Sequence, residues 1–270
     1  MKKFYVIGHP VAHSLSPKIH AMFAEQCGEE IDYQSIDFEP GSFIESLGRL
    51  RREQNPYGAN ITLPFKKDAA DYCTELTERA RVAGAVNTMT FSGHQVFGDN
   101  TDGVGFVHDV CGRCGFDFVG KRVLVLGAGG AARGVIAAVR PLGCARITVA
   151  NRTESRAVSL AEEMGIYAAA FTDLRRGFDI VINATSAGLS GAAPAVPNTI
   201  FAEAQLACEL TYSQFATPFM RLARDSGCPR VEDGLGMLIE QAAESFKVWL
   251  GVAPDTAPVY KALRGAAADF

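Results

Sequence analysis

Short apolar runs alternate with amphipathic stretches of helical period along the whole chain, without repeats or low-complexity segments. In the first part of the chain, these runs predict strands at Phe4–Gly8, Tyr33–Phe38, Gly58–Leu63 and Ala85–Phe91, then a tight turn at Ser92-Gly93-His94 and a strand at Gln95–Gly98. Helices are predicted to begin near Pro17, Ser42 and Leu76. This alternation predicts an α/β protein with mainly parallel sheets.

The second part of the chain begins near residue 103 with a predicted helix that runs to about Cys114. Four apolar strands follow, in the segments RVLVL, RITVA, FDIVIN and LACEL, and the first two are clearly linked by a helix. Such a series is typical of a nucleotide-binding sheet. Two helical stretches end the chain, MLIEQAAESFKVWLGV and PVYKALRGAAADF, and they either finish the second domain or fold back on the first.

Length and composition favour two domains and a small soluble ligand. The 270 residues are 48% hydrophobic and 21% charged, which is enough for two cores. The net charge of −4, with scattered basic residues, argues against a nucleic-acid partner. The N-terminal apolar run is too short for a signal peptide, and no stretch approaches the roughly 18 apolar residues of a membrane span. We therefore expect a cytoplasmic protein without membrane contact.

The seven cysteines lie at irregular spacings, which favours reduced thiols in a chain without a signal peptide. Cys111 and Cys114 form a CxxC pair, but no second Cys or His pair lies nearby. We interpret both as small packing residues on a helix and predict no metal site.

A glycine-rich turn directly after the strand Arg122–Leu126 carries the pattern GxGxxA and opens a helix to about Val139. Gly127 permits the tight turn, Gly129 lets the backbone approach a pyrophosphate, and Ala132 lets the helix pack near the sheet. Such turns also serve packing alone, but the flanking strand and helix favour a dinucleotide site. The predicted cofactor contacts of this turn are Gly127, Ala128, Gly129, Gly130 and Ala131.

The end of the second strand of this sheet indicates which dinucleotide binds. NAD sites commonly place an acid here for the ribose 2′-hydroxyl, whereas this chain has Asn151-Arg152-Thr153. A guanidinium and two neutral donors suit a 2′-phosphate, so NADP is the predicted cofactor, although Arg152 could also merely cap a strand end. The missing acid also argues against an S-adenosylmethionine methyltransferase.

Two hydroxyl groups near the first helix predict an anion site. Ser16 is a natural N-cap and Pro17 a natural first helical residue, so part of this segment is helix-start chemistry. Capping does not explain Ser14. Two hydroxyls at a helix start are well suited to holding a carboxylate.

A second polar segment runs from Asn60 to Lys66. The strand period places Asn60 and Thr62 on one face, with Ile61 and Leu63 on the other. Pro64 then ends the strand just before Lys66. The segment therefore presents an amide, a hydroxyl and an amine at one strand edge, where they could bind a ligand. A sheet edge that is merely protected from other strands by polar residues and a lysine has the same composition.

A third polar segment lies where the chain passes to the second domain. Asn87 and Thr88 occupy a predicted strand, and Asp99-Asn100-Thr101-Asp102-Gly103 follows. Asp102 either caps the next helix or pairs with Lys66 from the opposite side of an interdomain cleft. In the second case the two residues form a proton-transfer and orienting pair.

Eight motifs in order resemble the shikimate dehydrogenase family from end to end. They are SLSP at 14–17, NITLPFK at 60–66, AVNT at 85–88, DNTDG at 99–103, GAGGAARG at 127–134, NRT at 151–153, NATSAG at 183–188 and GLGMLIEQA at 234–242. The resemblance implies an α/β substrate domain of residues 1–103, completed by C-terminal helices at 238–270. It further implies a Rossmann-type NADP-binding domain at 104–237 and an active site in the interdomain cleft.

The resemblance also implies a role for each matching residue. Ser14 and Ser16 would bind the substrate carboxylate together with Tyr212, and Lys66 and Asp102 would be the catalytic pair. The residues implied to hold ring hydroxyls are Asn60, Thr62, Asn87 and Gln241. Those implied to join the cofactor site are Thr185, Ser186 and Gly234.

The implied reaction is the reversible, NADPH-dependent reduction of 3-dehydroshikimate to shikimate, a step of aromatic amino acid (chorismate) biosynthesis. One segment departs from the family: many members have an Asp before the tyrosine and a proline soon after it, whereas residues 208–218 read CELTYSQFATP. Two alternatives are a quinate/shikimate dehydrogenase of broader substrate and cofactor scope, and a noncatalytic NADPH-binding sensor. The sequence is compatible with a monomer or a homodimer.

Overall fold

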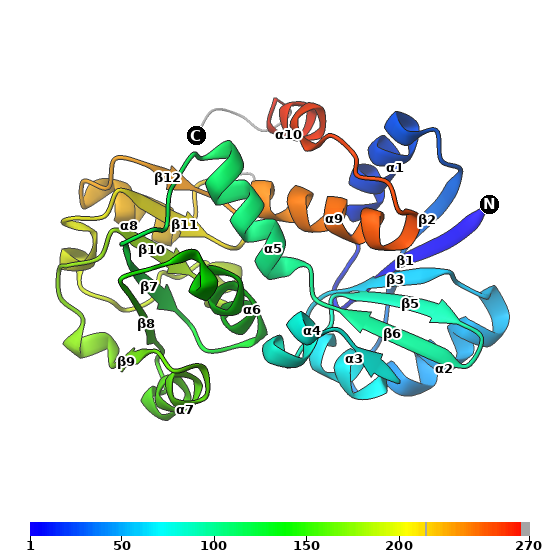
Figure 1. Ribbon diagram of the computed structural model, residues 1–270, viewed down its shortest axis with the longest axis horizontal. Helices are drawn as coiled ribbons and strands as arrows, with labels where there is room; N and C mark the ends of the chain where they lie inside the picture. The colour runs from blue at the N-terminus through cyan, green and yellow to red at the C-terminus, as the bar shows by residue number, and fades with distance from the viewer. Residues whose placement is uncertain (214, 266–270) are drawn as a thin grey trace. The chain divides into compact units, whose positions relative to one another are not determined.

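The computed structural model describes residues 1–213 and 215–265, which divide into two compact units (Figure 1). Unit 1 comprises residues 1–105 and 239–262. Unit 2 comprises residues 106–238 and, at the end of the described chain, residues 263–265. Each unit has a six-stranded sheet with helices, so the predicted two-domain α/β fold is confirmed.

The sheet of unit 1 has the strand order β2-β1-β3-β5-β6-β4. Its strands are β1 (Lys2–Gly8), β2 (Ile31–Asp37), β3 (Gly58–Ile61), β4 (Glu75–Leu76), β5 (Thr88–Ser92) and β6 (Gln95–Asp99). The first three are parallel, but β5 is antiparallel to both β3 and β6. Of the five strand pairings in this sheet, three are parallel and two are antiparallel, so the sheet is mixed and the prediction of mainly parallel sheets holds. The predicted turn explains the antiparallel pairing of β5 with β6, because Gly93 at φ 59° lets the two strands form a hairpin.

The helices of unit 1 begin close to the predicted positions, with one addition. They are α1 (Ser16–Cys27), α2 (Phe43–Gln54), α3 (Lys66–Tyr72), α4 (Glu78–Ala83), α9 (Leu235–Leu250), of which residues from 239 on belong to this unit, and α10 (Thr256–Arg264), of which residues up to 262 belong to it. The helix α3 was not predicted, and the strand before it ends at Ile61, not Leu63. The helix expected near Leu76 begins at Glu78 because the Thr77 hydroxyl accepts the Ala80 N–H and caps it.

Helices cover both faces of this sheet. On one face, α2, α3 and α4 contribute Phe43, Leu47, Ala69 and Ala80 to an apolar cluster. On the other face, aromatic side chains of α1 and α9 pack on the strands, and the rings of Phe4 and Trp249 lie 4.7 Å apart. A Cβ atom at Gly58 would lie 2.6 Å from the Trp249 indole nitrogen, so glycine makes room for α9 there.

His20 of α1 is a buried imidazole in this aromatic layer. Neither ring nitrogen has a hydrogen-bond partner among the described residues, and the ring stacks on Tyr33 with centroids 4.3 Å apart. Burial lowers the pKa of His20 to about 3. An unfolded histidine has a pKa near ~6.5, so between these values the unfolded chain takes up a proton that the folded chain does not. Folded-state stability is therefore lost as pH falls below about 6.5.

We predict that His20→Phe weakens this acid sensitivity. Between pH 8 and pH 5 the histidine costs the native protein about 2 kcal/mol, and phenylalanine keeps the stacking without titrating. The free energy of unfolding in urea, measured at both pH values, should therefore fall by about 2 kcal/mol less in the variant than in the native protein. His13→Phe is the control, because His13 is exposed. An equal pH dependence in His20→Phe and the native protein would contradict the prediction.

The sheet of unit 2 is parallel throughout, in the order β12-β11-β10-β7-β8-β9. Its strands are β7 (Arg122–Leu126), β8 (Arg146–Ala150), β9 (Tyr167–Ala169), β10 (Ile180–Asn183), β11 (Leu206–Glu209) and β12 (Val231–Glu232). The four predicted strands are present. The two edge strands β9 and β12 were missed because they are short and carry no buried apolar run.

Helices and turns connect these strands. The helices are α5 (Asp102–Val107), of which residues from 106 on belong to this unit, its continuation as a π-helical segment at His108–Arg113, then α6 (Gly130–Val139), α7 (Glu154–Met164) and α8 (Pro218–Asp225). Short 3₁₀ turns lie at Arg140–Leu142, Phe171–Asp173, Ala187–Ser190 and Asn198–Phe201.

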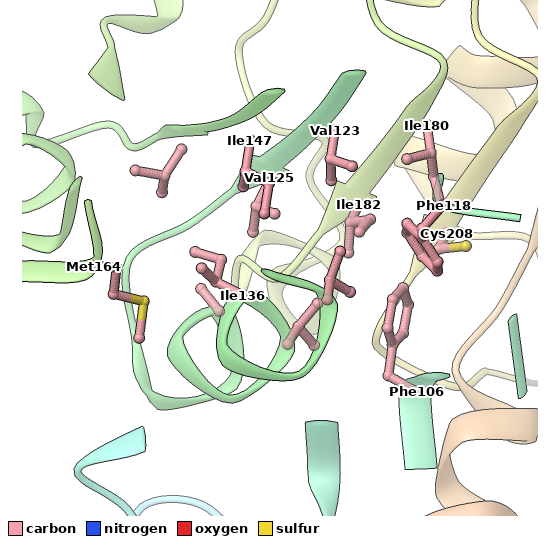
Figure 2. Packing of buried hydrophobic residues seen from close by; sticks show 14 of the residues in the cluster. Phe106, Phe118, Val123, Val125, Ile136, Ile147, Met164, Ile180, Ile182 and Cys208 are labelled. Carbon is pink, nitrogen blue, oxygen red and sulfur yellow. The ribbon is translucent and has the colours of Figure 1, made fainter. Parts of the chain in front are cut away.

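The core of unit 2 lies on both faces of its sheet. On one face, Val123 and Val125 pack with Ile136 of α6 (Figure 2). On the other, Leu124 contacts a cluster that contains Phe219 of α8. Because both faces are covered, the strands read in the sequence as continuous apolar runs.

The burial of the cysteines agrees only in part with the interpretation from the sequence. Cys114 is buried, as expected for a packing residue, but Cys111 is exposed, so that part of the interpretation is wrong. The seven cysteines are free thiols, and the described residues hold no cluster of metal-ligating side chains. Within the same residues, no helix combines the length and the apolar character needed to cross a membrane.

Candidate active site

Lys66 and Asp102 form an ion pair in unit 1, with Nζ and Oδ2 2.5 Å apart. Lys66 is the first residue of α3 and Asp102 the first of α5. The Lys66 side chain is 21% exposed and the Asp102 side chain 7%, so the pair is largely shielded from solvent but a ligand can still contact the Lys66 amine. The sequence suggested that the two approach from opposite sides of an interdomain cleft. That expectation is wrong, because both belong to the same unit.

Asn87 fixes the second oxygen of Asp102. The Asn87 amide nitrogen donates to Asp102 Oδ1 at 2.9 Å, to Thr101 Oγ1 at 2.8 Å and to Gln241 Oε1 at 3.1 Å. Its oxygen accepts the Thr101 N–H at 2.8 Å and the Thr88 hydroxyl at 2.9 Å. Asn87 therefore connects the carboxylate beside Lys66 to helix α9.

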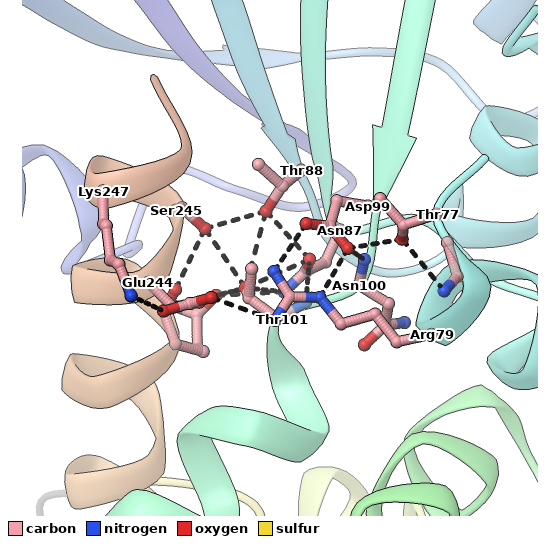
Figure 3. A network of polar contacts seen from close by, with 12 residues as sticks. Thr77, Arg79, Asn87, Thr88, Asp99, Asn100, Thr101, Glu244, Ser245 and Lys247 are labelled. Carbon is pink, nitrogen blue, oxygen red and sulfur yellow. Dashed lines mark hydrogen bonds and ion pairs between the residues drawn. The ribbon is translucent and has the colours of Figure 1, made fainter. Parts of the chain in front are cut away.

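Ser245 extends this network one helical turn beyond Gln241. Its hydroxyl lies 2.8 Å from Thr88 Oγ1 and 3.1 Å from Thr101 Oγ1 (Figure 3). The Asn60 amide also donates to it, at 3.1 Å. Gln241 was predicted as a site residue from the sequence, whereas Ser245 was not. The spacing of four residues on one helix was the available signal, since such residues share a face.

The polar residues of the Asn60–Lys66 segment differ in how many of their hydrogen-bonding groups already have a partner within the protein. Asn60 is 5% exposed, and its oxygen accepts the Tyr33 hydroxyl at 2.7 Å while its amide donates within the network. The half-buried Thr62 hydroxyl has no partner among the described residues. Asp102 takes one of the three N–H bonds of the Lys66 ammonium. Thr62 and Lys66 thus keep polar capacity for a ligand, whereas Asn60 and Asn87 mainly hold the network together.

Ser14 and Ser16 lie directly at the start of α1. The Ser14 hydroxyl oxygen accepts the Ser16 N–H at 3.2 Å, and Leu15 takes the N-cap position. The prediction that Ser16 is the cap is therefore wrong, because the helix already begins with Ser16. The Ser14 O–H is still available as a donor, since the hydrogen bond to the Ser16 N–H uses only the Ser14 oxygen.

A group of charged residues anchors α9 beside the network (Figure 3). Arg79 donates to Asp99 at 2.6 and 2.5 Å and to Glu244 of α9 at 3.0 Å, and Thr77 donates to Asp99 at 2.6 Å. Although burial opposes the shift, Arg79 and Thr77 lower the pKa of Asp99. Asp99 therefore stays ionised and keeps α9 tied to β6.

In unit 2, the carboxyl ends of the central strands form a row. Leu126 pairs with Ala150 on one side and with Asn183 on the other, and Asn183 pairs with Glu209. The connections reverse direction between β7 and β10, which is where open parallel sheets bind their ligands.

The turn after β7 has the shape that a pyrophosphate needs. Gly127 has φ 109°, and a Cβ there would lie 2.8 Å from the carbonyl oxygen of Ala184, so only glycine fits. Gly129 is the N-cap of α6, and a Cβ at this position would meet no atom within 4 Å. Ala128, Gly130 and Ala131 complete an accessible turn at a helix N-terminus, which suits an anion.

The residues after β8 leave positive charge available. Arg152 is exposed and forms no hydrogen bond or ion pair with the described part of the chain, while the Asn151 amide donates to the Thr153 carbonyl at 2.9 Å. Arg152 therefore does not cap the strand end. Arg156, in the first turn of α7, is likewise exposed with an unpaired guanidinium among those residues. Arg156 was not predicted as a site residue, although it lies only four residues after Arg152.

The remaining predicted cofactor residues lie after β10 and β11. The Thr185 N–H and hydroxyl both donate to the Asn183 side-chain oxygen, and Ser186 is exposed. Gly234 packs against the loop that contains Tyr212, since its N–H donates to the Thr211 carbonyl at 3.3 Å. The structure thus brings these residues to the same edge of the sheet as Gly127.

Three family models match the chain. They are the shikimate dehydrogenase substrate binding domain at residues 6–89, shikimate / quinate 5-dehydrogenase at 112–191, and the shikimate 5′-dehydrogenase C-terminal domain at 234–264.

Similar proteins cover almost the whole chain. The shikimate dehydrogenase (NADP(+)) of Methylobacillus flagellatus is 47% identical over 98% of this chain and 100% of its own, and that of Nitrosospira multiformis is 47% identical over 97% and 96%. Among solved structures, shikimate 5-dehydrogenase from Thermus thermophilus in complex with NADP(H) and shikimate matches with a TM-score of 0.89 and 38% identity, over 98% of this chain and 100% of that one. The 5-ketofructose reductase of a Gluconobacter strain also matches, with a TM-score of 0.82 and 30% identity, over 98% of each chain.

Proposed function

Because this chain belongs to the shikimate dehydrogenase family, we propose that it catalyses the reversible, NADPH-dependent reduction of 3-dehydroshikimate to shikimate. It is an NADP-dependent oxidoreductase, and its substrate is a small molecule. The observation that carries the proposal is the Lys66–Asp102 pair within a buried polar network of unit 1. The open turn at Gly129 and the unpaired Arg152 of unit 2 fit the cofactor.

When bound, NADPH supplies the hydride for the ring ketone. Lys66 stabilises the negative charge that develops on the ketone oxygen and delivers a proton to it. Asp102 accepts one N–H of the ammonium and so aims the other two, while Asn87 keeps the carboxylate in place. The protein thereby aligns the acceptor oxygen before the reaction, which lowers the entropy cost of the step.

The hydroxyl groups of the substrate and its carboxylate require separate contacts. Thr62 donates to or accepts from a ring hydroxyl, and Asn60, Asn87 and Gln241 shape the same site from the network. Ser14 and Ser16 hold the carboxylate at the start of α1, and Tyr212 is a further substrate contact. Support comes from the free hydroxyl capacity of Thr62 and Ser14.

Thr62→Val is expected to raise KM for shikimate about tenfold and to leave KM for NADP within about twofold, because it removes one hydroxyl that a buried ligand group would need. Initial rates at varied shikimate and NADP check this. Thr62→Ser is the matched control, since it keeps the hydroxyl and should stay near the native KM. A native KM in Thr62→Val would remove Thr62 from the site.

Substrate and cofactor scope are tested by four rates of reduced-nicotinamide formation, with shikimate or quinate, each with NADP or NAD. We expect fast turnover only with shikimate and NADP. Comparable rates with quinate or NAD would place the chain in the broader quinate/shikimate group, and tight NADPH binding without any turnover would favour a sensor.

The protein is further proposed to work in the cytoplasm as a monomer or a homodimer. The free thiols of the described residues suit a reducing compartment. Sedimentation of the purified protein, with and without NADP, measures the assembly state; a tetramer would contradict the proposal.

A further inference from the structure

Glu209, the last residue of β11, is a buried carboxylate with no cation beside it among the described residues. It is 1% exposed, and within the described part of the chain its oxygens accept from neutral groups. Oε2 accepts the Asn183 amide at 2.8 Å and the Thr217 hydroxyl at 3.1 Å, and Oε1 accepts the Thr211 N–H at 3.2 Å. Burial raises the pKa of Glu209. Burying a carboxylate without a paired cation costs free energy of folding, which indicates that the segments bonded to Glu209 have a role that offsets this cost.

These hydrogen bonds connect three segments that are separate in the sequence. Asn183, held by Glu209, accepts the Thr185 N–H and hydroxyl at 3.2 and 2.7 Å and so fixes the turn after β10. The bond to Thr211 fixes the first residues of the loop after β11. Thr217 caps α8 by accepting the Met220 N–H. One side chain therefore sets the path of two loops and the start of a helix.

The two loops lie at one end of the row of strand termini. Glu209 pairs with Asn183, Asn183 pairs with Leu126, and Leu126 pairs with Ala150. In the proposed function, the pyrophosphate lies at the turn after β7 and the 2′-phosphate lies near Arg152 after β8. A dinucleotide placed in this way extends its other half in the opposite direction, over the ends of β10 and β11.

We propose that Glu209 is a positioning residue for the nicotinamide half of NADP, acting through the turn after β10 and the loop after β11. The inference rests on the proposed use of NADP. Close packing supports it, since a Cβ at Gly188 would lie 3.6 Å from Glu209 Oε2. The 3₁₀ turn after β10 thus lies directly against the carboxylate as well as being bonded to it through Asn183.

Glu209→Gln is the test, because glutamine keeps the shape but has a single oxygen. Its NH2 group must face either the Thr211 N–H or the two donors at Oε2, so one loop loses its acceptor. Calorimetric titration with NADP should show Kd raised about tenfold, and kcat should fall, as expected when a buried donor is left unpaired. Kd for adenosine 2′,5′-bisphosphate, which lacks the nicotinamide half, should stay within about twofold of the native value.

Asp179→Asn is the matched control. Asp179 is a partly buried acid that accepts hydrogen bonds from Arg122. It directly precedes β10 and so lies at the amino ends of the strands, whereas Glu209 lies at their carboxyl ends. Loss of the Asp179 charge should change the Kd for NADP and the Kd for adenosine 2′,5′-bisphosphate by the same factor, or leave both unchanged.

The outcomes separate the inference from the proposed function. An equal rise of both Kd values in Glu209→Gln, with a lower unfolding midpoint, would show a general structural role and overturn the inference. Unchanged values for both ligands would overturn it too. If the native protein binds adenosine 2′,5′-bisphosphate and NADP but lacks turnover, the proposed reaction fails while the difference between the two Kd values still supports Glu209. Failure of the native protein to bind NADP would overturn both.

Discussion

Lys66→Ala lowers kcat for shikimate oxidation by at least about 10²-fold, the size expected of a single acid–base group. In the native protein, Lys66 is the first residue of α3, and its ammonium group lies 2.5 Å from Asp102 Oδ2. The helix therefore fixes the Lys66 backbone, and the ion pair fixes the ammonium group. Alanine removes the donor and leaves the buried Asp102 with Asn87 as its side-chain partner. KM for NADP should change far less, because the predicted cofactor residues lie in unit 2. Steady-state rates with shikimate and NADP measure both parameters.

Lys67→Ala is the control for this experiment. Lys67 follows on the same helix but is exposed and has no bond to a described side chain. It should keep the native kcat. Because the loss of the Lys66 amine leaves a buried carboxylate without its cation, circular dichroism and the Kd for NADP must show that the variant is folded. A folded Lys66→Ala protein with near-native kcat would end the catalytic assignment of Lys66.

The nucleotide-binding sheet could be predicted well from the sequence, for local reasons. Val123 and Leu124 point to opposite faces, and both are covered, so β7 appears as an unbroken apolar run. The turn that follows needs glycine at position 127 whatever the rest of the fold does. Features of this kind depend on a few neighbouring residues and are visible without tertiary information.

Elements without an apolar face were not predictable in the same way. The helix α3 reads KKDAADY and buries only Ala69, so no hydrophobic period marks it. Its existence matters, because it places Lys66 at a helix start. The antiparallel pairing of β5 with β3 was not predicted for a different reason: the turn at Gly93 indicates the hairpin of β5 and β6, but the identity of the other neighbour of β5 leaves little trace in the strand's own pattern.

For the site, residue types could be predicted but not their distances. The sequence named Lys66 and Asp102 as a possible pair, yet 36 positions separate them and only the packed unit shows that they meet. Ser245 lies 157 positions from Thr88, and their 2.8 Å contact depends on α9 returning to unit 1. Long-range hydrogen bonds of this kind follow from the fold as a whole.

Arg152→Ala raises KM for NADP about 10- to 100-fold, while kcat at saturating NADP stays within about threefold. A guanidinium bound to a phosphate contributes charge-assisted hydrogen bonds, each stronger than a neutral one, and alanine removes them all. Arg152 is exposed and bonds no described residue, so its removal should not unfold unit 2. KM for NAD, which lacks the 2′-phosphate, should hardly change.

The comparison of the two cofactors makes this prediction specific. If Arg152 reads the 2′-phosphate, the ratio of kcat/KM for NADP to that for NAD falls by the same 10- to 100-fold, and raised salt weakens NADP binding more in the native protein than in the variant. Arg175→Ala is the control, because Arg175 is an exposed arginine of the same unit whose guanidinium donates to backbone carbonyls of its own turn. An unchanged ratio in Arg152→Ala would assign the discrimination elsewhere, with Arg156 as the next variant to measure, since its guanidinium is also free among the described residues.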